Sequence, residues 1–133
     1  MRNIDGFWYG AYHYTDARLA GIPLSASANP VAFRAQFVVD RDGKVTGTIA
    51  DEMGYDFPAS LDGEFDGTAL RFTKRYFSGT APTGASARPI VYQGALSEDG
   101  TTLSGTWKIR GWFLILPVTT SGIWEAQRYT PAY

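Results

Sequence analysis

Three short turn segments constrain this chain more than any other feature of its sequence. Asp40-Arg41-Asp42-Gly43, Asp66-Gly67 and Glu98-Asp99-Gly100 each separate two segments of alternating apolar and polar residues. Glycine supplies the positive φ that a tight hairpin turn needs, so each turn predicts two consecutive antiparallel strands. The chain is therefore expected to fold as a meander of β-hairpins.

The segments flanking these turns predict about eight strands, because they alternate with period two and recur roughly every ten residues. The expected strands are Phe7–Tyr14, Ala32–Val39, Lys44–Asp51, Ser60–Phe65, Ala69–Tyr76, Pro89–Leu96, Thr102–Arg110 and Thr120–Arg128. The expected connections are Asp16–Pro30, Gly54–Pro58, Ser78–Arg88 and Gly111–Thr119. No stretch keeps the apolar spacing of a helix over several turns.

The predicted fold is one all-β domain covering residues 1–133, a closed antiparallel up-and-down barrel. Closing the meander removes the unpaired strand edges that an open sheet would expose. A β-sandwich is the main alternative. The aromatic share of 15% and the 15 glycines suit strands joined by tight turns.

Charge and composition exclude several function classes. A net charge of −1 provides no broad positive field, so neither nucleic acid nor a membrane is an expected partner. Without cysteine there is no disulfide, thiol nucleophile or cysteine-based zinc site, and the single histidine, His13, is expected on the outer surface. No cofactor or metal is therefore expected. Because the N-terminal segment lacks a signal-like apolar run, we expect a cytoplasmic location.

Two features of the first and last strands resemble those of the calycin superfamily. Gly6-Phe7-Trp8 matches the Gly-x-Trp pattern on the first calycin strand, and Arg128 stands where lipocalins place an arginine beside that tryptophan. The chain length, the short hairpins and the stretches Phe72–Tyr76, Tyr92–Gly94 and Ser104–Trp107 resemble uncharacterised bacterial proteins of the avidin/streptavidin branch. The resemblance implies a barrel architecture.

Biotin binding does not follow from this resemblance. Avidins place an asparagine and a serine shortly after the first-strand tryptophan, where they bind the ureido group, whereas this chain has Gly10 and Tyr14 there. Fold alone does not fix function, so the function must be sought in the residues that line the barrel.

Alternation from Trp8 predicts which side chains point into the barrel. The expected interior set is Trp8, Gly10, Tyr12, Tyr14, Phe33, Phe37, Val45, Ile49, Asp51, Leu61, Phe65, Leu70, Phe72, Lys74, Tyr76, Ile90, Tyr92, Leu96, Leu103, Trp107, Ile109, Trp124 and Arg128. Asp51 and Lys74 are charged residues on otherwise apolar strand faces. We expect them to form an ion pair, to lie at a solvent-exposed end of the barrel or to contact a ligand, because a buried unpaired charge is costly.

Eight of these residues form the candidate ligand site, because small-molecule sites are mainly apolar with a few directed polar groups. They are Tyr12, Tyr14, Asp51, Lys74, Tyr76, Tyr92, Trp107 and Trp124. The favoured function is binding of a small apolar or aromatic molecule. One alternative is a barrel isomerase or cyclase that uses Lys74, Asp51 and tyrosines, although no catalytic residue is assigned. The other is a solid structural barrel, since about eight strands enclose little more than side chains.

One segment near the last strand is apolar throughout: Trp112-Phe113-Leu114-Ile115-Leu116-Pro117-Val118. We expect such a segment to be buried against other apolar atoms. A homodimer interface or a lid over the barrel is one interpretation, and a strand of the core is the other. Pro117 argues against a central strand along the whole run.

Overall fold

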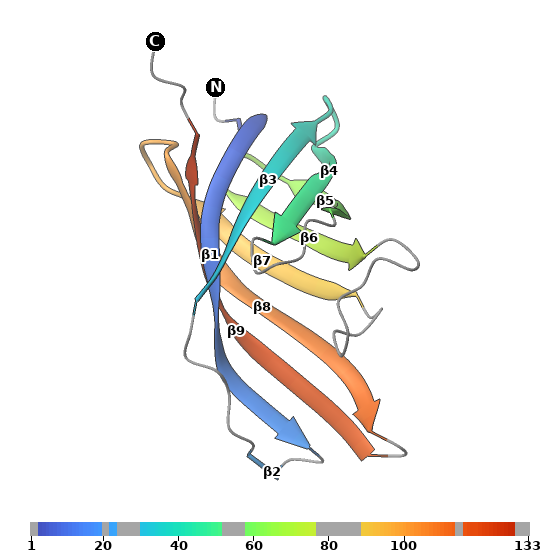
Figure 1. The fold of residues 1–133 in the computed structure, drawn as a ribbon. Coiled ribbons are helices and arrows are strands. Elements are labelled where there is room, and N and C mark those ends of the chain that lie inside the picture. Colours follow the sequence, from blue (N-terminus) through green and yellow to red (C-terminus); the bar gives the residue numbers. More distant parts are fainter. Residues whose placement is uncertain are drawn as a thin grey trace.

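A computed structural model describes residues 3–19, 22–23, 30–51, 58–76, 89–113 and 116–129, and these form a closed antiparallel barrel (Figure 1). The strands are β1 (Gly6–Leu19), β2 (Ile22–Pro23), β3 (Val31–Val39), β4 (Lys44–Asp51), β5 (Pro58–Phe65), β6 (Ala69–Tyr76), β7 (Ile90–Leu96), β8 (Thr102–Phe113) and β9 (Leu116–Arg128). Each strand from β3 to β9 pairs with its neighbour in the chain, and β1 pairs with both β3 and β9. The predicted up-and-down barrel of eight strands is confirmed, with the two-residue β2 added beside β1.

The three glycine turns connect their strands as the sequence predicts. Gly43, Gly67 and Gly100 have φ values of 83°, 100° and 77°. These values lie in the left-handed region, which glycine enters without the Cβ clash of other residues. The turns join β3 to β4, β5 to β6 and β7 to β8.

β1, β8 and β9 run well beyond the ends that their sequence patterns predict. β1 continues to Leu19 through an irregularity between Tyr14 and Asp16, so the loop expected from Asp16 is wrong over residues 16–19. β8 reaches Phe113 and β9 starts at Leu116, so the connection expected at 111–119 is wrong except at 114–115, which lie outside the described residues. The three strands extend because they pair with one another, a long-range contact that no local pattern reveals.

We call this extension the arm and define it as residues 13–19, 110–113 and 116–121. Here β1 has passed its last β3 partner and β8 its last β7 partner, while β9 pairs with both. Figure 1 shows the arm projecting below the barrel, with β2 at its tip. Pro117 pairs with Trp112 but lies one residue beyond Val118, the last partner of β1, so its missing N–H removes no bond to β1.

The predicted interior set lies inside the barrel. Most of its members are buried, and Tyr12, Tyr14, Tyr76 and Ile109 are partly buried against the core. Alternation gave this result because nearly every strand keeps an unbroken period of two. The break expected at Gly54–Pro58 is wrong at Pro58, which begins β5, while residues 54–57 and the expected loop at 78–88 lie outside the described residues.

Aromatic rings fill the centre of the barrel. Phe72 and Tyr92 stack with their centroids 4.6 Å apart and an interplanar angle of 10°. Trp124 packs edge-on against both rings, and Phe37 packs against Phe72 at 5.6 Å. Such ring pairs contribute beyond their buried area, so this layer is a strong part of the core.

Trp8 and Arg128 close one end of the barrel, which we call the base. The Trp8 indole donates a hydrogen bond of 2.9 Å to the Ile4 carbonyl oxygen, and the Arg128 guanidinium lies 4.6 Å from the Trp8 ring centroid. The guanidinium also donates to the backbone carbonyl oxygens of Asn3, Asp5 and Gly100. One side chain thus ties the N-terminal segment to the β7–β8 turn. The described residues include no helix long and apolar enough to cross a membrane.

The contacts at the base predict that the free energy of unfolding is sensitive to substitution of Arg128. Arg128→Lys keeps the charge but loses the planar fork that serves several carbonyls, so we expect it to lower the free energy of unfolding by about 1–3 kcal/mol. Urea denaturation followed by tryptophan fluorescence measures this change. The control is Arg71→Lys on the exposed face of β6, expected within about 0.5 kcal/mol of wild type. Equal losses for the two variants would contradict the role given to Arg128.

Candidate functional site

A buried ion pair lies toward the opposite end of the barrel, which we call the mouth. Asp51 is the last residue of β4 and Lys74 belongs to β6, with exposed fractions of 5% and 0%. The Lys74 Nζ atom lies 2.8 Å from each carboxylate oxygen of Asp51. Burying either charge alone would be expensive, so each residue makes the position of the other tolerable.

Two tyrosine hydroxyls complete the hydrogen bonding of the Asp51 carboxylate. Tyr76 donates to Oδ2 at 2.6 Å and Tyr12 donates to the same atom at 3.3 Å. In the closed strand order β1 lies opposite β6, so the chain of contacts from Tyr12 through Asp51 to Lys74 crosses the barrel. No buried side-chain nitrogen or oxygen atom of the described residues lacks a hydrogen-bond partner.

Aromatic rings surround this polar cluster. The Lys74 Nζ atom lies 4.8 Å from the Tyr76 ring centroid and 5.5 Å from that of Tyr12, distances typical of cation–π contacts. Tyr14 packs edge-on against Trp107 with centroids 4.9 Å apart, and Tyr12 contacts both rings. Tyr12, Tyr14 and Trp107 therefore form a continuous aromatic wall beside the ion pair.

The Trp107 indole is held against the backbone of β1 and β9. Its indole N–H is shared between the carbonyl oxygens of His13 and Ile123, each 3.2 Å away. A Cβ atom at Gly122 would lie 2.6 Å from the indole and 1.7 Å from the His13 oxygen, so only glycine fits beneath the ring. This fixes the ring on which Tyr14 packs.

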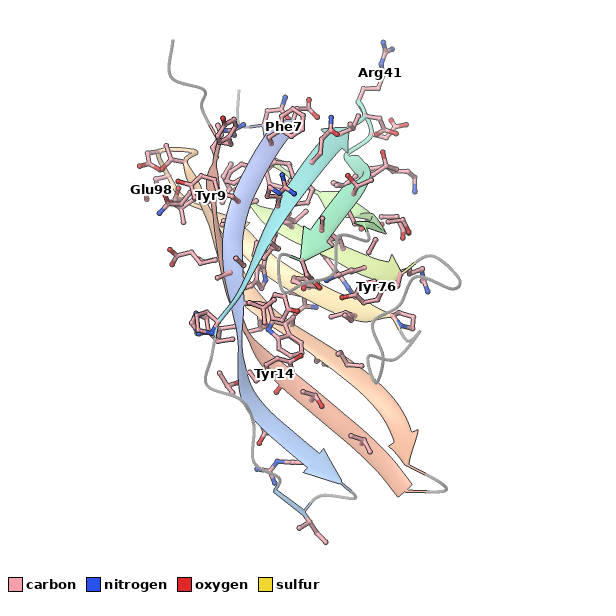
Figure 2. The ribbon with its side chains drawn as sticks, viewed as in Figure 1. Phe7, Tyr9, Tyr14, Arg41, Tyr76 and Glu98 are labelled. Carbon is pink, nitrogen blue, oxygen red and sulfur yellow. The ribbon has the colours of Figure 1, made fainter. Side chains whose placement is uncertain are left out.

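The Tyr14 hydroxyl, unlike those of Tyr12 and Tyr76, does not donate to Asp51. The side chain is half-buried, and its hydroxyl makes no hydrogen bond to the described part of the chain. In Figure 2, Tyr14 and Tyr76 lie near the level at which the arm leaves the barrel. Tyr14 thus offers a ligand an aromatic ring and a hydroxyl that no described residue bonds.

Burial controls the protonation of the cluster. Desolvation raises the pKa values of Tyr12, Tyr14 and Tyr76, and the Asp51 charge adds to the rise. Desolvation also lowers the pKa of Lys74, against the opposing effect of Asp51. The tyrosines are consequently held as neutral hydrogen-bond donors and are poor acids.

The structure divides the eight predicted site residues into two groups. Tyr12, Tyr14, Asp51, Lys74, Tyr76 and Trp107 lie together at the mouth. Tyr92 and Trp124 instead belong to the stacked layer deeper in the core.

Phe33 is a further mouth residue that was expected inside the barrel but not in the site. Its ring lies 6.4 Å from that of Tyr12, and it pairs directly with Asp51 across the β3–β4 ladder. The Asp40–Gly43 turn fixes this register, so counting outward from the turn could have found the pair.

The structure gives partial outcomes for two other expectations, those for His13 and for the apolar run 112–118. His13 pairs with Ile123, which is 50% exposed on the outer face of β9, so His13 lies on the outer face of β1 as expected. In the apolar run 112–118, the backbone of all but residues 114–115 is paired as strand, while the side chains of 112–116 lie outside the described set. The proposed homodimer through Trp112–Val118 therefore stays a prediction.

Comparison with known proteins adds no relative. The chain matches no protein-family model, and no curated protein matches it. Its class is defined by its structure, as a closed up-and-down barrel with a buried polar cluster and an aromatic wall at the mouth. No group of three or more His, Cys, Asp or Glu side chains that could hold a metal ion occurs among the described residues.

The ion pair predicts an asymmetric pattern of stability losses. Asp51→Asn leaves Lys74 buried without a counter-charge and should lower the free energy of unfolding by about 3–5 kcal/mol. Lys74→Met should cost less, because the Asp51 carboxylate keeps two tyrosine donors. The double variant Asp51→Leu with Lys74→Met should recover most of the loss, as replacing both members of a buried pair often does.

Urea denaturation of the three variants measures these differences. The matched control is Asp62→Asn, which breaks the exposed pair between Asp62 and Arg75 and should cost about 1 kcal/mol or less. If Asp51→Asn lowered the free energy of unfolding no more than the control does, the buried pair would not stabilise the mouth.

The raised tyrosine pKa values predict alkaline instability. Tyr12, Tyr14, Tyr76 and Tyr92 all have pKa values above the usual 10.0 in the folded protein, so folding favours their neutral form. Their stabilising effect is complete below 10.0 and is lost as pH rises above it, because the unfolded chain then releases protons that the folded chain retains. The lowered pKa of Lys74 has the opposite effect on stability at pH values below 10.5, but one lysine then opposes four tyrosines.

Tyrosinate absorbance and denaturant midpoints, recorded together between about pH 9 and pH 12, test this linkage. These four phenols should ionise only as the protein unfolds. Ionisation of these four tyrosines in a protein that stays folded would contradict the assignment.

Proposed function

We propose that this protein is a non-catalytic binding barrel that holds a small, uncharged aromatic molecule at its mouth. The observation that carries the proposal is the half-buried Tyr14 ring, packed on Trp107 at 4.9 Å, with a hydroxyl that bonds to none of the described residues. A ligand ring can stack on such a surface while a polar atom of the ligand bonds the hydroxyl. Binding sites commonly combine aromatic walls with a few directed polar groups in this way.

The mouth suits this ligand better than the interior does. The rings of Phe37, Phe72, Tyr92 and Trp124 pack against one another in the centre of the barrel. An eight-stranded barrel is just wide enough for side chains or one small ligand, so a ligand there would have to displace this layer. At the mouth, partly exposed tyrosine rings are available without such displacement.

The electrostatics of the mouth favour an uncharged ligand. Asp51 and Lys74 neutralise each other, and the carboxylate also receives two hydroxyl donors. A charged ligand would therefore meet no unpaired opposite charge among the described mouth residues, and it would lose hydration on binding. An aromatic molecule with one or two polar atoms has no such penalty.

An isomerase or cyclase that uses Lys74, Asp51 and tyrosines is the second candidate, favoured by the lowered pKa of Lys74. Three observations weigh against it. Lys74 has no exposed surface, its ammonium is bonded to Asp51, and the pKa values of the bonded tyrosines are raised. General acid–base groups work best with pKa values near the operating pH.

We further propose that the barrel belongs to the calycin superfamily, near its avidin/streptavidin branch. The contact between Trp8 and Arg128 at the base supports this proposal, because the first-strand tryptophan and last-strand arginine were expected to meet there. For location we propose the cytoplasm, since a chain with no cysteine requires no oxidising compartment.

Titration with phenylnaphthylamine, an uncharged aromatic fluorophore, tests the binding proposal. We expect a fluorescence increase on binding to the wild type. Tyr14→Ala should weaken the affinity about tenfold or more, and Tyr14→Phe, which keeps the ring, should weaken it only a few-fold. His13→Ala is the matched control, because His13 is adjacent in sequence but faces outward.

Native mass spectrometry of the purified protein complements the titration by revealing any co-purifying small molecule. Equal affinity of wild type and Tyr14→Ala, with both variants folded, would overturn the mouth as the site. Absence of binding by phenylnaphthylamine together with absence of a co-purifying molecule would favour the solid structural barrel. Conversion of a bound molecule, lost in a folded Lys74→Met variant, would replace the binding function with the enzymatic one.

A further inference from the structure

The three tyrosine hydroxyls at the mouth differ in what they can still offer a ligand. A phenolic hydroxyl has one proton to donate, and its oxygen also accepts hydrogen bonds. Tyr12 and Tyr76 each donate that proton to Oδ2 of Asp51, at 3.3 Å and 2.6 Å. Any further hydrogen bond to these two oxygen atoms must therefore come from a ligand donor. Tyr14 is different, because its proton is bonded to none of the described residues.

The other donors of the mouth are directed into the protein itself. The Lys74 ammonium donates to both carboxylate oxygens of Asp51 and has no exposed surface. The Trp107 indole N–H is shared between two backbone carbonyl oxygens. Of the six predicted site residues that meet at the mouth, Tyr14 is therefore the one that can still donate to a ligand, while Tyr12 and Tyr76 can accept.

Tyr12 is the acceptor that lies beside Tyr14. The two side chains point inward from the same strand, and their rings pack edge-on with centroids 6.1 Å apart. Both rings also pack on Trp107. Desolvation is the main cause of the raised pKa of Tyr12, and the nearby Asp51 and Tyr14 add to it. Tyr76 instead extends from β6 and lies apart from Tyr14 in Figure 2.

A chain of hydrogen bonds leads from Tyr12 into the buried ion pair. Tyr12 donates to the Asp51 carboxylate, whose negative charge is held in place by Lys74. A hydroxyl that donates to a carboxylate becomes a better acceptor, because the bonds of such a chain polarise one another. The Tyr12 oxygen is therefore suited to a strong donor. A phenol is a stronger donor than an aliphatic alcohol, because its hydroxyl is more acidic.

We propose that the ligand is a phenol, an inference that rests on the binding function proposed above. The ligand hydroxyl accepts a hydrogen bond from Tyr14 and donates its own proton to Tyr12, while the ligand ring packs on the aromatic wall. One hydroxyl group thus uses both the free donor and the free acceptor. An aryl ether or carbonyl would engage Tyr14 alone. An arylamine would engage Tyr12 alone, because its nitrogen lone pair is delocalised into the ring.

Three compounds that share one ring system test the proposal in the wild-type protein. Each of 2-naphthol, 2-methoxynaphthalene and naphthalene is titrated in competition with phenylnaphthylamine. We expect 2-naphthol to bind about fivefold or more tightly than 2-methoxynaphthalene, which cannot donate to Tyr12, and naphthalene to bind more weakly again, because it also cannot accept from Tyr14. Burial of apolar surface alone predicts that 2-naphthol binds most weakly, since its hydroxyl loses the most hydration.

Variants that keep the ring and remove the hydroxyl assign each bond. Tyr12→Phe should abolish the preference for 2-naphthol over 2-methoxynaphthalene, and Tyr14→Phe should abolish the preference for 2-methoxynaphthalene over naphthalene. Each preference is a ratio within one variant, so a general change in affinity cancels. Tyr9→Phe is the matched control, because Tyr9 lies on the same strand but is 49% exposed, and it should keep both preferences. Circular dichroism checks that every variant is folded.

Three results would overturn the proposal, and they separate it from the binding function. If 2-naphthol binds the wild type no more tightly than the other two compounds, while Tyr14→Ala still weakens all three, the mouth binds aromatic molecules but not phenols in particular. A preference for 2-naphthol that Tyr76→Phe removes and Tyr12→Phe retains would assign the acceptor to Tyr76. Absence of binding by any of these aromatic compounds would overturn the binding function together with the phenol.

Discussion

The pairing of the first strand with the last is the constraint on which the structure depends. β1 and β9 pair from Trp8 with Arg128 at the base to Leu19 with Val118 at the tip of the arm. Without this pairing the remaining strands would form an open meander with two exposed edges, which invites association through unpaired backbone groups. Closure also brings the N-terminal segment to the Arg128 guanidinium, whose carbonyl partners lie in that segment and in the β7–β8 turn.

Closure determines the mouth as well as the base. Tyr12 reaches the Asp51 carboxylate only because β1 lies opposite β6 in the closed strand order. The contacts among Tyr12, Asp51, Lys74 and Tyr76 therefore span the interior and join strands that share no ladder. A polar cluster in this position is satisfied only when the barrel has closed correctly, so it disfavours other pairings of the strands.

Sequence patterns predicted the barrel and most of its interior because each hairpin is specified locally, although the buried Ile4, Ala35 and Ala59 were not named. The glycine turns fix strand register, and alternation then assigns every side chain to one face. The arm was missed because the prediction used only local patterns. Its strands are defined by pairing between β1, β8 and β9, and the irregularity between Tyr14 and Asp16 breaks the period of two on which the prediction relied.

The candidate site was only half predictable. Alternation identified Asp51 and Lys74 as inward charges, and their mutual need for a partner suggested a pair. It could not show that they meet, because Lys74 pairs with Leu61, which in turn pairs with Gly47, four residues before Asp51 along β4. The contact depends on the stagger of strands around a closed barrel, which no single hairpin reveals. The same limit explains why Tyr92 and Trp124 were grouped with the mouth although they pack in the layer below.

The division of the barrel into layers also narrows where function can lie. The base is occupied by Trp8 and Arg128 and the centre by stacked rings, so both serve the fold itself. The Tyr14 side of the mouth then remains as a surface that folding alone does not account for. Tyr14 lies just beyond Tyr12, the residue of β1 that pairs with the start of β3, so its ring stands where β1 leaves the closed barrel for the arm. The ring packs on Trp107, whose indole N–H donates to backbone oxygens of β1 and β9. The strand pair that closes the barrel therefore also positions the surface that we propose binds the ligand.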